Sequence, residues 1–286
     1  MPVHFPIDRS VISVTGEEAE HFLQNLVTCD VVSIPAGTAR ACALLTPQGK
    51  VMFDFLIMPD GDGGYLIDVD AGLAGDFLRR LTMYKLRAKV EIAESDESLA
   101  AISWQGDSTS SGRTVTDSRF PEDIRVKRHY GAAPEGEDDA SGWTALRIAH
   151  GVAESGADFA AGDAFPHDIS FDQNGGVGFK KGCFVGQEVV SRMQHRGTAR
   201  RRLVVVTGET ALPATGTALE AGGKTIGTLG SVAGNAALAL VRLDRAKDAM
   251  DAGIPISAAG ETVTLSLPAN VSYRWPEDAS EEDRDA

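Results

Sequence analysis

A glycine-rich bend that runs into a helix, at residues 179–197, is the sequence feature that most restricts the fold of this chain. Gly182 and Gly186 permit a tight bend and a close approach of the backbone to another segment. Glu188 then opens a helix, because a carboxylate suits the positive end of the helix dipole. Gly197 is placed to end that helix as a C-terminal cap. The segment therefore predicts extended chain, a tight turn and a surface helix, in that order.

Upstream of this bend, strand and helix patterns alternate. Residues 11–14 form a short β-branched run, and Thr15 with Glu18 has the spacing of a capping box for the helix that follows. The apolar positions of that helix fall on one face, at Ala19, Phe22, Leu23 and Leu26. Three strand-like runs separated by Gly-containing turns come next and predict a β-meander, at residues 41–46, 51–58 and 65–69.

An amphipathic pattern at residues 71–86 predicts a second helix. Two further strands are expected at residues 88–92 and 99–104, and a short helix at residues 141–152. Helices and antiparallel strands in this mixed order indicate the α+β class.

After Arg202 the character of the chain changes. Short apolar runs are separated by Gly and Pro turns, at residues 203–207, 225–229, 236–241 and 262–267. Spacing of this kind is typical of a small all-β domain, a barrel or a sandwich.

Charge and composition exclude several classes of protein. The formal net charge of −14 argues against general nucleic-acid binding, because neutralising phosphates requires a basic face. No apolar run reaches the roughly 18 residues that a membrane helix needs. Six acids and one arginine in residues 277–286 predict a disordered acidic tail. Residues 1–10 contain no pattern of a targeting segment, so the sequence predicts a cytoplasmic protein, which we expect to be a monomer.

Cysteine usage leaves one thiol to explain. The three cysteines are far apart and form no CxxC pair, which argues against a disulfide framework or a metal site built within one chain. Cys183 lies in the bend beside Lys180 and Lys181, and ammonium groups near a helix N-terminus favour a reactive thiolate. The alternative is a buried cysteine that packs at a tight turn.

The eight residues from Lys181 to Glu188, KGCFVGQE, resemble the K-G-C-[YF]-x-G-Q-E motif of the YgfZ family. The motif positions with fixed identity are Lys181, Gly182, Cys183, Phe184, Gly186, Gln187 and Glu188. Arg192 and the arginines at 200–202 fit the same pattern, as do residues 23–31, 44–51 and 146–151. The resemblance covers about residues 7 to 275, and the family is related to the glycine-cleavage T-protein aminomethyltransferases.

This resemblance implies a fold and a function. The expected body is a three-domain, ring-like fold of the T-protein and YgfZ type, with residues 1–200 as the folate-binding region of two interleaved α+β subdomains. Residues 201–275 are expected to form an antiparallel β-barrel, and residues 276–286 the acidic tail. Family members bind tetrahydrofolate and support the assembly or repair of iron–sulfur clusters, mainly 4Fe–4S clusters. Their partners are client enzymes, including radical enzymes that modify tRNA, and other assembly proteins.

The resemblance also implies residues for folate. The candidates are Asp54, Trp143, Glu188, Arg192 and Arg196, with no resident metal. The tryptophan supplies a platform for the pterin ring and the arginines supply cations for the glutamate carboxylates. A second tryptophan of the family falls on Arg9 in this chain.

Aminomethyl transfer is the alternative function. T-proteins carry two adjacent aspartates where this chain has Phe53 and Asp54, and the first of them holds the reacting folate nitrogen. A phenyl ring neither accepts a proton nor stabilises a developing iminium. The glutamate that contacts the pterin in T-proteins is replaced by Ala149. Both differences favour the assembly factor, and a protein-interaction module without folate is a third class.

Cys183 then has three candidate roles. It ligates iron transiently, forms a mixed disulfide with a partner, or packs. Because clusters usually take four ligands, a single thiolate needs ligands from a second chain or a small thiol.

Overall fold

The computed structural model describes residues 2–6, 8–106, 110–197 and 199–276. The predicted acidic tail at residues 277–286 lies outside this part of the chain. The chain forms two compact units, each assembled from separate segments. Of the described residues, the first unit contains those within 2–143, 161–166 and 171–196, and the second contains those within 144–160, 167–170 and 197–276.

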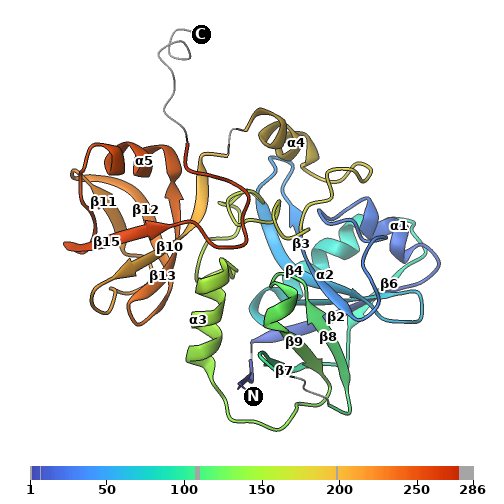
Figure 1. Ribbon diagram of the computed structural model, residues 1–286. Coiled ribbons are helices and arrows are strands. Elements are labelled where there is room, and N and C mark those ends of the chain that lie inside the picture. Colours follow the sequence, from blue (N-terminus) through green and yellow to red (C-terminus); the bar gives the residue numbers. More distant parts are fainter. Residues whose placement is uncertain (1, 7, 107–109, 198, 277–286) are drawn as a thin grey trace. The chain divides into compact units, whose positions relative to one another are not determined.

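A nine-stranded sheet forms the framework of the first unit (Figure 1). Its strand order is β1-β7-β9-β8-β3-β4-β5-β2-β6. The strands are β1 (Val3–His4), β2 (Arg9–Thr15), β3 (Thr38–Leu45), β4 (Val51–Pro59), β5 (Tyr65–Asp70), β6 (Glu91–Glu94), β7 (Leu99–Ser103), β8 (Arg113–Asp117) and β9 (Lys127–Tyr130). A 3-10 turn, η1 (Glu122–Ile124), lies between the last two strands in sequence. The neighbours β3, β4 and β5 are antiparallel, so the expected β-meander is confirmed.

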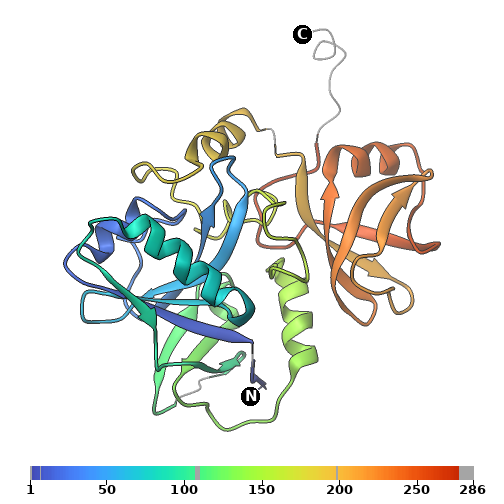
Figure 2. The same cartoon turned by 180° about the vertical axis from the view of Figure 1, so that it is seen from behind.

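Helices α1 (Ala19–Gln24) and α2 (Ala71–Lys85) cover one face of this sheet (Figures 1 and 2). Phe22 and Leu23 of α1 and Phe77 and Leu81 of α2 share a buried cluster with alternate residues of the strands. The period of two along each strand and of about 3.6 along each helix explains why these positions meet. The pattern at residues 71–86 therefore predicts α2 to within a residue.

Three details of the first unit differ from the sequence prediction. The capping box of Thr15 and Glu18 is absent: Thr15 ends β2, and the Glu18 carboxylate instead accepts the backbone N–H of Lys89 at 2.6 Å. The strand expected at residues 88–92 is displaced to β6. The sequence does not predict strands β8 and β9, because their polar residues conceal the alternation that marks a strand.

A closed six-stranded antiparallel barrel forms most of the second unit, in the order β10-β13-β12-β11-β14-β15. The strands are β10 (Arg201–Gly208), β11 (Ala218–Ala221), β12 (Lys224–Ala233), β13 (Ala236–Arg242), β14 (Ile256–Ala258) and β15 (Glu261–Ser266). The barrel closes because β10 pairs with both β13 and β15. Helix α5 (Leu243–Asp251) packs Ala246 and Ala249 against the barrel core. The α+β class and the C-terminal antiparallel barrel are thus confirmed.

The second unit also takes in chain from before the barrel. Helix α3 (Ala140–His150) begins in the first unit and its later residues belong to the second. Arg147 of α3 is buried and binds two side chains of this unit, Asp158 at 3.0 Å and Ser231 of β12 at 2.9 Å. The residues before the barrel therefore supply charged contacts that hold the barrel unit together.

Candidate functional site

The bend at residues 178–186 is bound to the loop that follows α1. The backbone N–H of Gly178 donates to the carbonyl oxygen of Thr28 at 2.8 Å, and the Thr28 hydroxyl donates to the carbonyl oxygen of Gly176 at 2.7 Å. A Cβ on Gly178 would lie 3.0 Å from the backbone nitrogen of Asp30. Glycine at this position therefore allows the two backbones to touch.

Lys181 makes the next attachment. Its ammonium donates to the carbonyl oxygens of Val27 and Cys29, both at 2.7 Å, and lies 5.3 Å from the centre of the Phe184 ring. Burial lowers the pKa of Lys181 below its ordinary value. The ammonium therefore points into the protein and binds backbone carbonyls.

The two motif glycines have different roles. Gly186 has a φ of +77°, and a Cβ there would lie 2.6 Å from the carbonyl oxygen of Thr46 in the β3–β4 turn. Gly182 has no atom within 4 Å of its Cβ position, and its φ is not in the left-handed region. The close approach expected from the sequence therefore belongs to Gly186, which seats the bend on the β3–β4 turn.

Cys183 lies exposed between these anchors, whereas Cys29 and Cys42 are buried. The alternative of a cysteine buried at a tight turn is therefore wrong. Phe184, the next residue, is buried and turns the chain back into the protein. The result is a thiol on the outside of a bend that is held on both sides.

The two buried cysteines, Cys29 and Cys42, contact each other near Lys181. The backbone N–H of Cys29 lies 3.2 Å from the Cys42 sulfur. Burial raises the pKa of Cys29 well above its ordinary value, and its contact with Cys42 adds to the rise. Burial opposes ionisation of Cys42 too, but hydrogen bonds from Cys29 and the charge of Lys181 lower the pKa of Cys42 overall. The charge of Lys181 thus acts on this pair.

Helix α4 (Gln187–Arg196) follows the bend as the sequence predicts. Val190 is buried, while Glu188, Arg192 and Arg196 are exposed. Glu188 and Arg192 lie four residues apart, a spacing that permits an ion pair along a helix, but none joins them within the described residues. Gly197 has a φ of +60°, the conformation expected of a glycine that ends a helix.

The strand that carries Phe53 and Asp54 separates their side chains. Phe53 is buried, with its ring centre 5.2 Å from that of Phe77 in α2. Asp54 is half-buried and, by the alternation of a strand, lies on the opposite face. Its charge acts on Arg9. The position that lacks the T-protein aspartate therefore contributes to the hydrophobic core.

Trp143 lies in an aromatic cluster of the first unit. Its side chain is 4% exposed and its ring packs against those of His4, Trp104 and Phe120. Binding of folate by Trp143 stays a prediction, and this packing favours a role in the core. Ala149 is exposed on α3.

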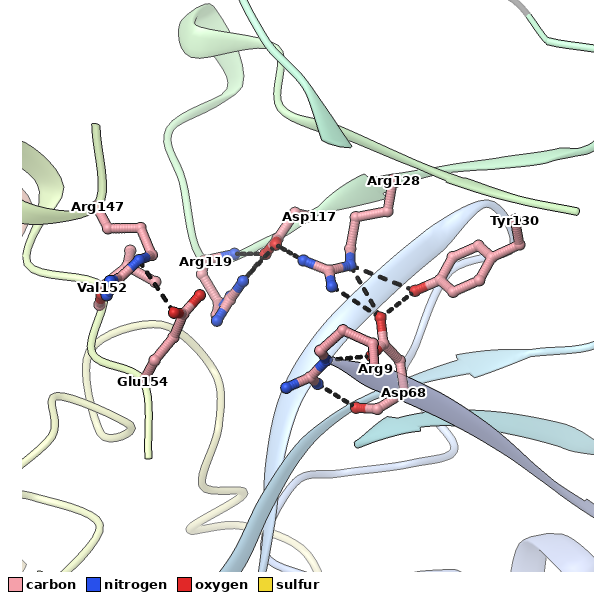
Figure 3. A network of polar contacts seen from close by, with 9 residues as sticks. All are labelled: Arg9, Asp68, Asp117, Arg119, Arg128, Tyr130, Arg147, Val152 and Glu154. Atoms are coloured by element: carbon pink, nitrogen blue, oxygen red, sulfur yellow. Dashed lines mark hydrogen bonds and ion pairs between the residues drawn. The ribbon is translucent and has the colours of Figure 1, made fainter. Parts of the chain in front are cut away.

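A buried charged network, which the sequence patterns do not predict, links three strands of the first unit (Figure 3). Asp68 of β5 accepts from Arg9 at 2.6 Å, from Arg128 of β9 at 2.8 Å and from the Tyr130 hydroxyl at 2.6 Å. Strands β5 and β9 are not neighbours in the sheet, so the sheet must curl to bring them together. No spacing in the sequence marks this contact.

Electrostatics of the network follow from its geometry. Burial alone would raise the pKa of Asp68, but the Arg128 and Arg9 guanidiniums and the Tyr130 hydroxyl hold it well below its ordinary value. Asp117 extends the network, because it binds Arg128 at 3.3 Å and Arg119 at 2.7 Å. Within this network each of these buried carboxylates is matched by more than one donor.

The arginines after α4 do not form one basic strip. Arg200 is exposed, but Arg201 binds the buried Asp168 at 2.9 Å. Arg202 is buried and donates to the carbonyl oxygen of His167 at 2.6 Å. Two of the three arginines therefore hold residues 167–170 to the barrel strand β10.

Neither a metal cluster nor a membrane helix is found in the part of the chain that the structure describes. Within it, no group of three or more His, Cys, Asp or Glu side chains is arranged to hold a metal ion. Among the same residues, none of the helices has the length and apolar character needed to span a membrane.

Comparison with protein families places two known domains on the chain. Residues 9–118 match the GCVT N-terminal domain, and residues 200–273 match the C-terminal beta-barrel domain of CAF17. The chain is also similar in fold to the glycine cleavage system aminomethyltransferase T of Bartonella henselae, with a TM-score of 0.71 and 15% identity. That similarity covers 96% of this chain and 88% of the other. It shows the fold, and it confirms the resemblance to T-proteins at that level.

Curated relatives are named for iron–sulfur cluster assembly. The chain is 34% identical to the "Iron-sulfur cluster assembly factor IBA57 homolog, mitochondrial" of Pyricularia oryzae, over 87% of this chain and 74% of the relative. The homolog from Neosartorya fischeri is 30% identical, over 96% of this chain and 76% of its own length. The prediction of a cytoplasmic protein is wrong by this comparison, since these relatives are named as mitochondrial. It rested on residues 1–10, which do not decide the compartment.

Proposed function

This chain belongs to the family of the iron–sulfur cluster assembly factor IBA57, and we propose that it acts in the assembly of iron–sulfur clusters through the exposed thiol of Cys183. The single observation that carries the proposal is the position of that thiol, exposed on a bend whose flanking residues are anchored to buried backbone. A thiolate is the usual protein ligand of iron–sulfur clusters. One thiolate is insufficient, so the remaining ligands come from a partner chain or a small thiol.

The proposed cargo is a cluster in transit to a client enzyme, mainly of the 4Fe–4S kind. We include radical enzymes that modify tRNA among the clients. In this role Cys183 contributes one sulfur ligand to a complex with the partner. Alternatively, its thiolate attacks a disulfide of the partner, forming a mixed disulfide while the partner's other sulfur leaves as a thiolate. The cluster is substrate and not a resident cofactor, which agrees with a site that supplies one thiol.

Replacement of Cys183 tests this proposal. In cells that lack the protein, the Cys183→Ala variant should fail to restore the activity of a 4Fe–4S enzyme. Cys29→Ala, which removes a buried thiol, serves as the matched control and should restore activity if it folds, as checked by circular dichroism. Full activity with Cys183→Ala would exclude the thiol from the function.

Tetrahydrofolate is the second part of the proposal. The residues of this chain fit folate only in part. Arg192 and Arg196 present exposed cations that suit its glutamate carboxylates, and Asp54 offers a carboxylate opposite the core face of β4. Phe53 and Ala149 lack the acidic groups that act on folate in T-proteins. The fit supports binding without aminomethyl transfer, so folate is proposed as a ligand rather than a reactant.

Calorimetric titration with tetrahydrofolate tests this second part. We expect saturable binding that weakens about tenfold or more in Arg192→Ala/Arg196→Ala, since charge-assisted bonds to the carboxylates are lost. Arg87→Ala/Lys224→Ala removes two exposed cations elsewhere and should bind like the unaltered protein. Titrations that show no heat of binding would count against folate as a ligand. Release of formaldehyde or ammonia from an aminomethyl donor would instead favour the function of an aminomethyltransferase.

A further inference from the structure

The bend that presents Cys183 is held at three points, and two of them are backbone contacts. On one side Gly178 lies against residues 28–30, and on the other Gly186 lies against the carbonyl oxygen of Thr46. Lys181, two residues before the thiol, provides a side-chain contact between them.

Lys181 is suited to this task by where its ammonium lies. It donates to two carbonyl oxygens of one loop, those of Val27 and Cys29, at 2.7 Å each. Hydrogen bonds from a charged donor are stronger than those between neutral groups. Lys180, the preceding residue, is exposed. Two adjacent lysines that look equivalent in the sequence therefore differ in the structure, because Lys181 binds the backbone of another loop while Lys180 is exposed.

The loop that binds Lys181, residues 27–29, is itself attached to strand β3. Thr28 pairs with Ala43 of β3 through its backbone N–H, at 3.0 Å, and through its hydroxyl, at 2.9 Å. The backbone N–H of Cys29 contacts the Cys42 sulfur, again on β3. A continuous series of contacts thus runs from the central sheet through residues 27–29 and Lys181 to the bend that carries Cys183.

We propose that Lys181 is a positioning residue, which fixes the Cys183 thiol by tying the bend to the carbonyl groups of Val27 and Cys29. This inference rests on the proposed function of Cys183. It gives Lys181, the first residue of the motif, the role of holding the bend in place. The sequence alone instead predicts that this lysine activates the thiol. The Lys181 ammonium holds the bend in one conformation, so that a partner's cluster or thiol meets Cys183 without the entropy cost of ordering it.

A spin label on Cys183 tests the positioning directly. Cys183 is the exposed thiol, so a thiol-specific nitroxide should label it and leave the buried pair unmodified. Lys181→Met keeps most of the side-chain stem but removes the ammonium, and should give a narrower spectrum from a more mobile label. Lys180→Met is the matched control and should give the original spectrum, and Lys181→Arg should restore part of the order.

Hydrogen exchange separates local loosening from loss of stability. The Gly178 amide should exchange at least about tenfold faster in Lys181→Met, while the amides of β4 keep their protection. An unchanged spectrum together with unchanged exchange at Gly178 would overturn the proposal. Equal acceleration in β4 and in the bend would overturn it too, because Lys181 would then serve general stability.

A double-variant assay in cells links position to function. Lys181→Met should lower the recovered activity of a 4Fe–4S enzyme, and Lys181→Met/Cys183→Ala should be no worse than Cys183→Ala. A further loss in the double variant would show that Lys181 acts elsewhere than through the thiol. Full activity of Cys183→Ala would refute the proposed function, while the spin-label and exchange results would still decide the positioning.

Discussion

Cys183 shows how much a single residue's surroundings decide. The three cysteines are chemically identical in the sequence, yet two are enclosed below the bend and one lies outside it. Exposure follows from the anchors on either side, and no property of the thiol itself predicts it. At this scale the motif identifies the residue, and the packing of its neighbours leaves its thiol exposed to solvent.

Thiol modification should therefore be selective. Brief treatment of the folded protein with iodoacetamide should add one adduct, located on Cys183, because alkylation needs an accessible thiolate. Cys29 and Cys42 should react only after denaturation. Mass spectrometry of the intact and digested protein measures both results, and modification of Cys29 or Cys42 at the rate of Cys183 would contradict the burial.

Asp68 gives a prediction about acid stability. Its pKa in the folded protein is below the unfolded value, so it stabilises the fold above about pH 4 and that contribution is lost as the pH falls through the folded pKa. Asp68→Asn leaves Arg9 and Arg128 without their carboxylate and should cost about 3–5 kcal/mol at pH 7.

Urea denaturation at a series of pH values measures this effect. Between about pH 5 and pH 3 the Asp68→Asn variant should lose less stability than the unaltered protein, because the titrating group is gone. Asp248→Asn, at an exposed carboxylate on α5, should match the unaltered protein in its stability at pH 7 and in the stability that it loses on acidification. An identical acid response with and without Asp68 would contradict the assignment.

At the scale of elements, the bend and α4 form a unit that depends on one glycine. Gly186 combines a left-handed φ with contact to the β3–β4 turn, while Gly182 is open to solvent. Both glycines belong to the motif, and the sequence offers no means to separate them. The distinction arises because Gly186 meets a turn far away in the chain.

Alanine at the two glycines should have unequal effects. Gly186→Ala should destabilise the first unit by about 1–3 kcal/mol through backbone strain, with more from the clash with Thr46. Gly182→Ala should change stability by less than about 0.5 kcal/mol. Chemical denaturation of the two variants provides the comparison, and equal losses would mean that Gly186 is not the contact point.

On the scale of the whole molecule, the two units do not follow the chain in simple order. The change of character near residue 200 marks the start of the barrel strands, close to the last segment of the second unit at Gly197. Residues 144–160 and 167–170 also belong to that unit. They join it through buried charged side chains, because Arg147 and Asp158 both bind Ser231 of β12 and Asp168 binds Arg201 of β10.

Arg147 should therefore stabilise the barrel unit from outside the barrel. Arg147→Met leaves the buried Asp158 without its guanidinium and should cost about 3–5 kcal/mol. Differential scanning calorimetry should show a lower unfolding temperature for this variant. Arg200→Met, at an exposed arginine, should unfold at the same temperature as the unaltered protein. An equally small change in the unfolding temperature of Arg147→Met would show that residues 144–160 are only loosely attached to the barrel.

Local patterning in the sequence is enough to predict many of the elements. Apolar patterning predicts α1, α2, the meander of β3 to β5, α3 and four of the barrel strands, because each side chain's face depends only on residues a few positions away. The acidic start and the Gly197 cap predict α4. The KGCFVGQE motif supports the resemblance to a known family and singles out Cys183. Strands β8 and β9 escape prediction, because Asp117 of β8 and Arg128 of β9 are charged residues buried by charge pairing rather than by hydrophobicity.

Which of these residues act together depends on the folded chain. Folding places Phe53 in the core, encloses Trp143 among aromatic rings, and turns Lys181 inward while leaving Lys180 outside. It also brings Asp68 and Arg128 together across a curled sheet. Each outcome depends on contacts between segments distant in the chain, where the free energy comes from burial and paired charges, and no short pattern of residues records such partners.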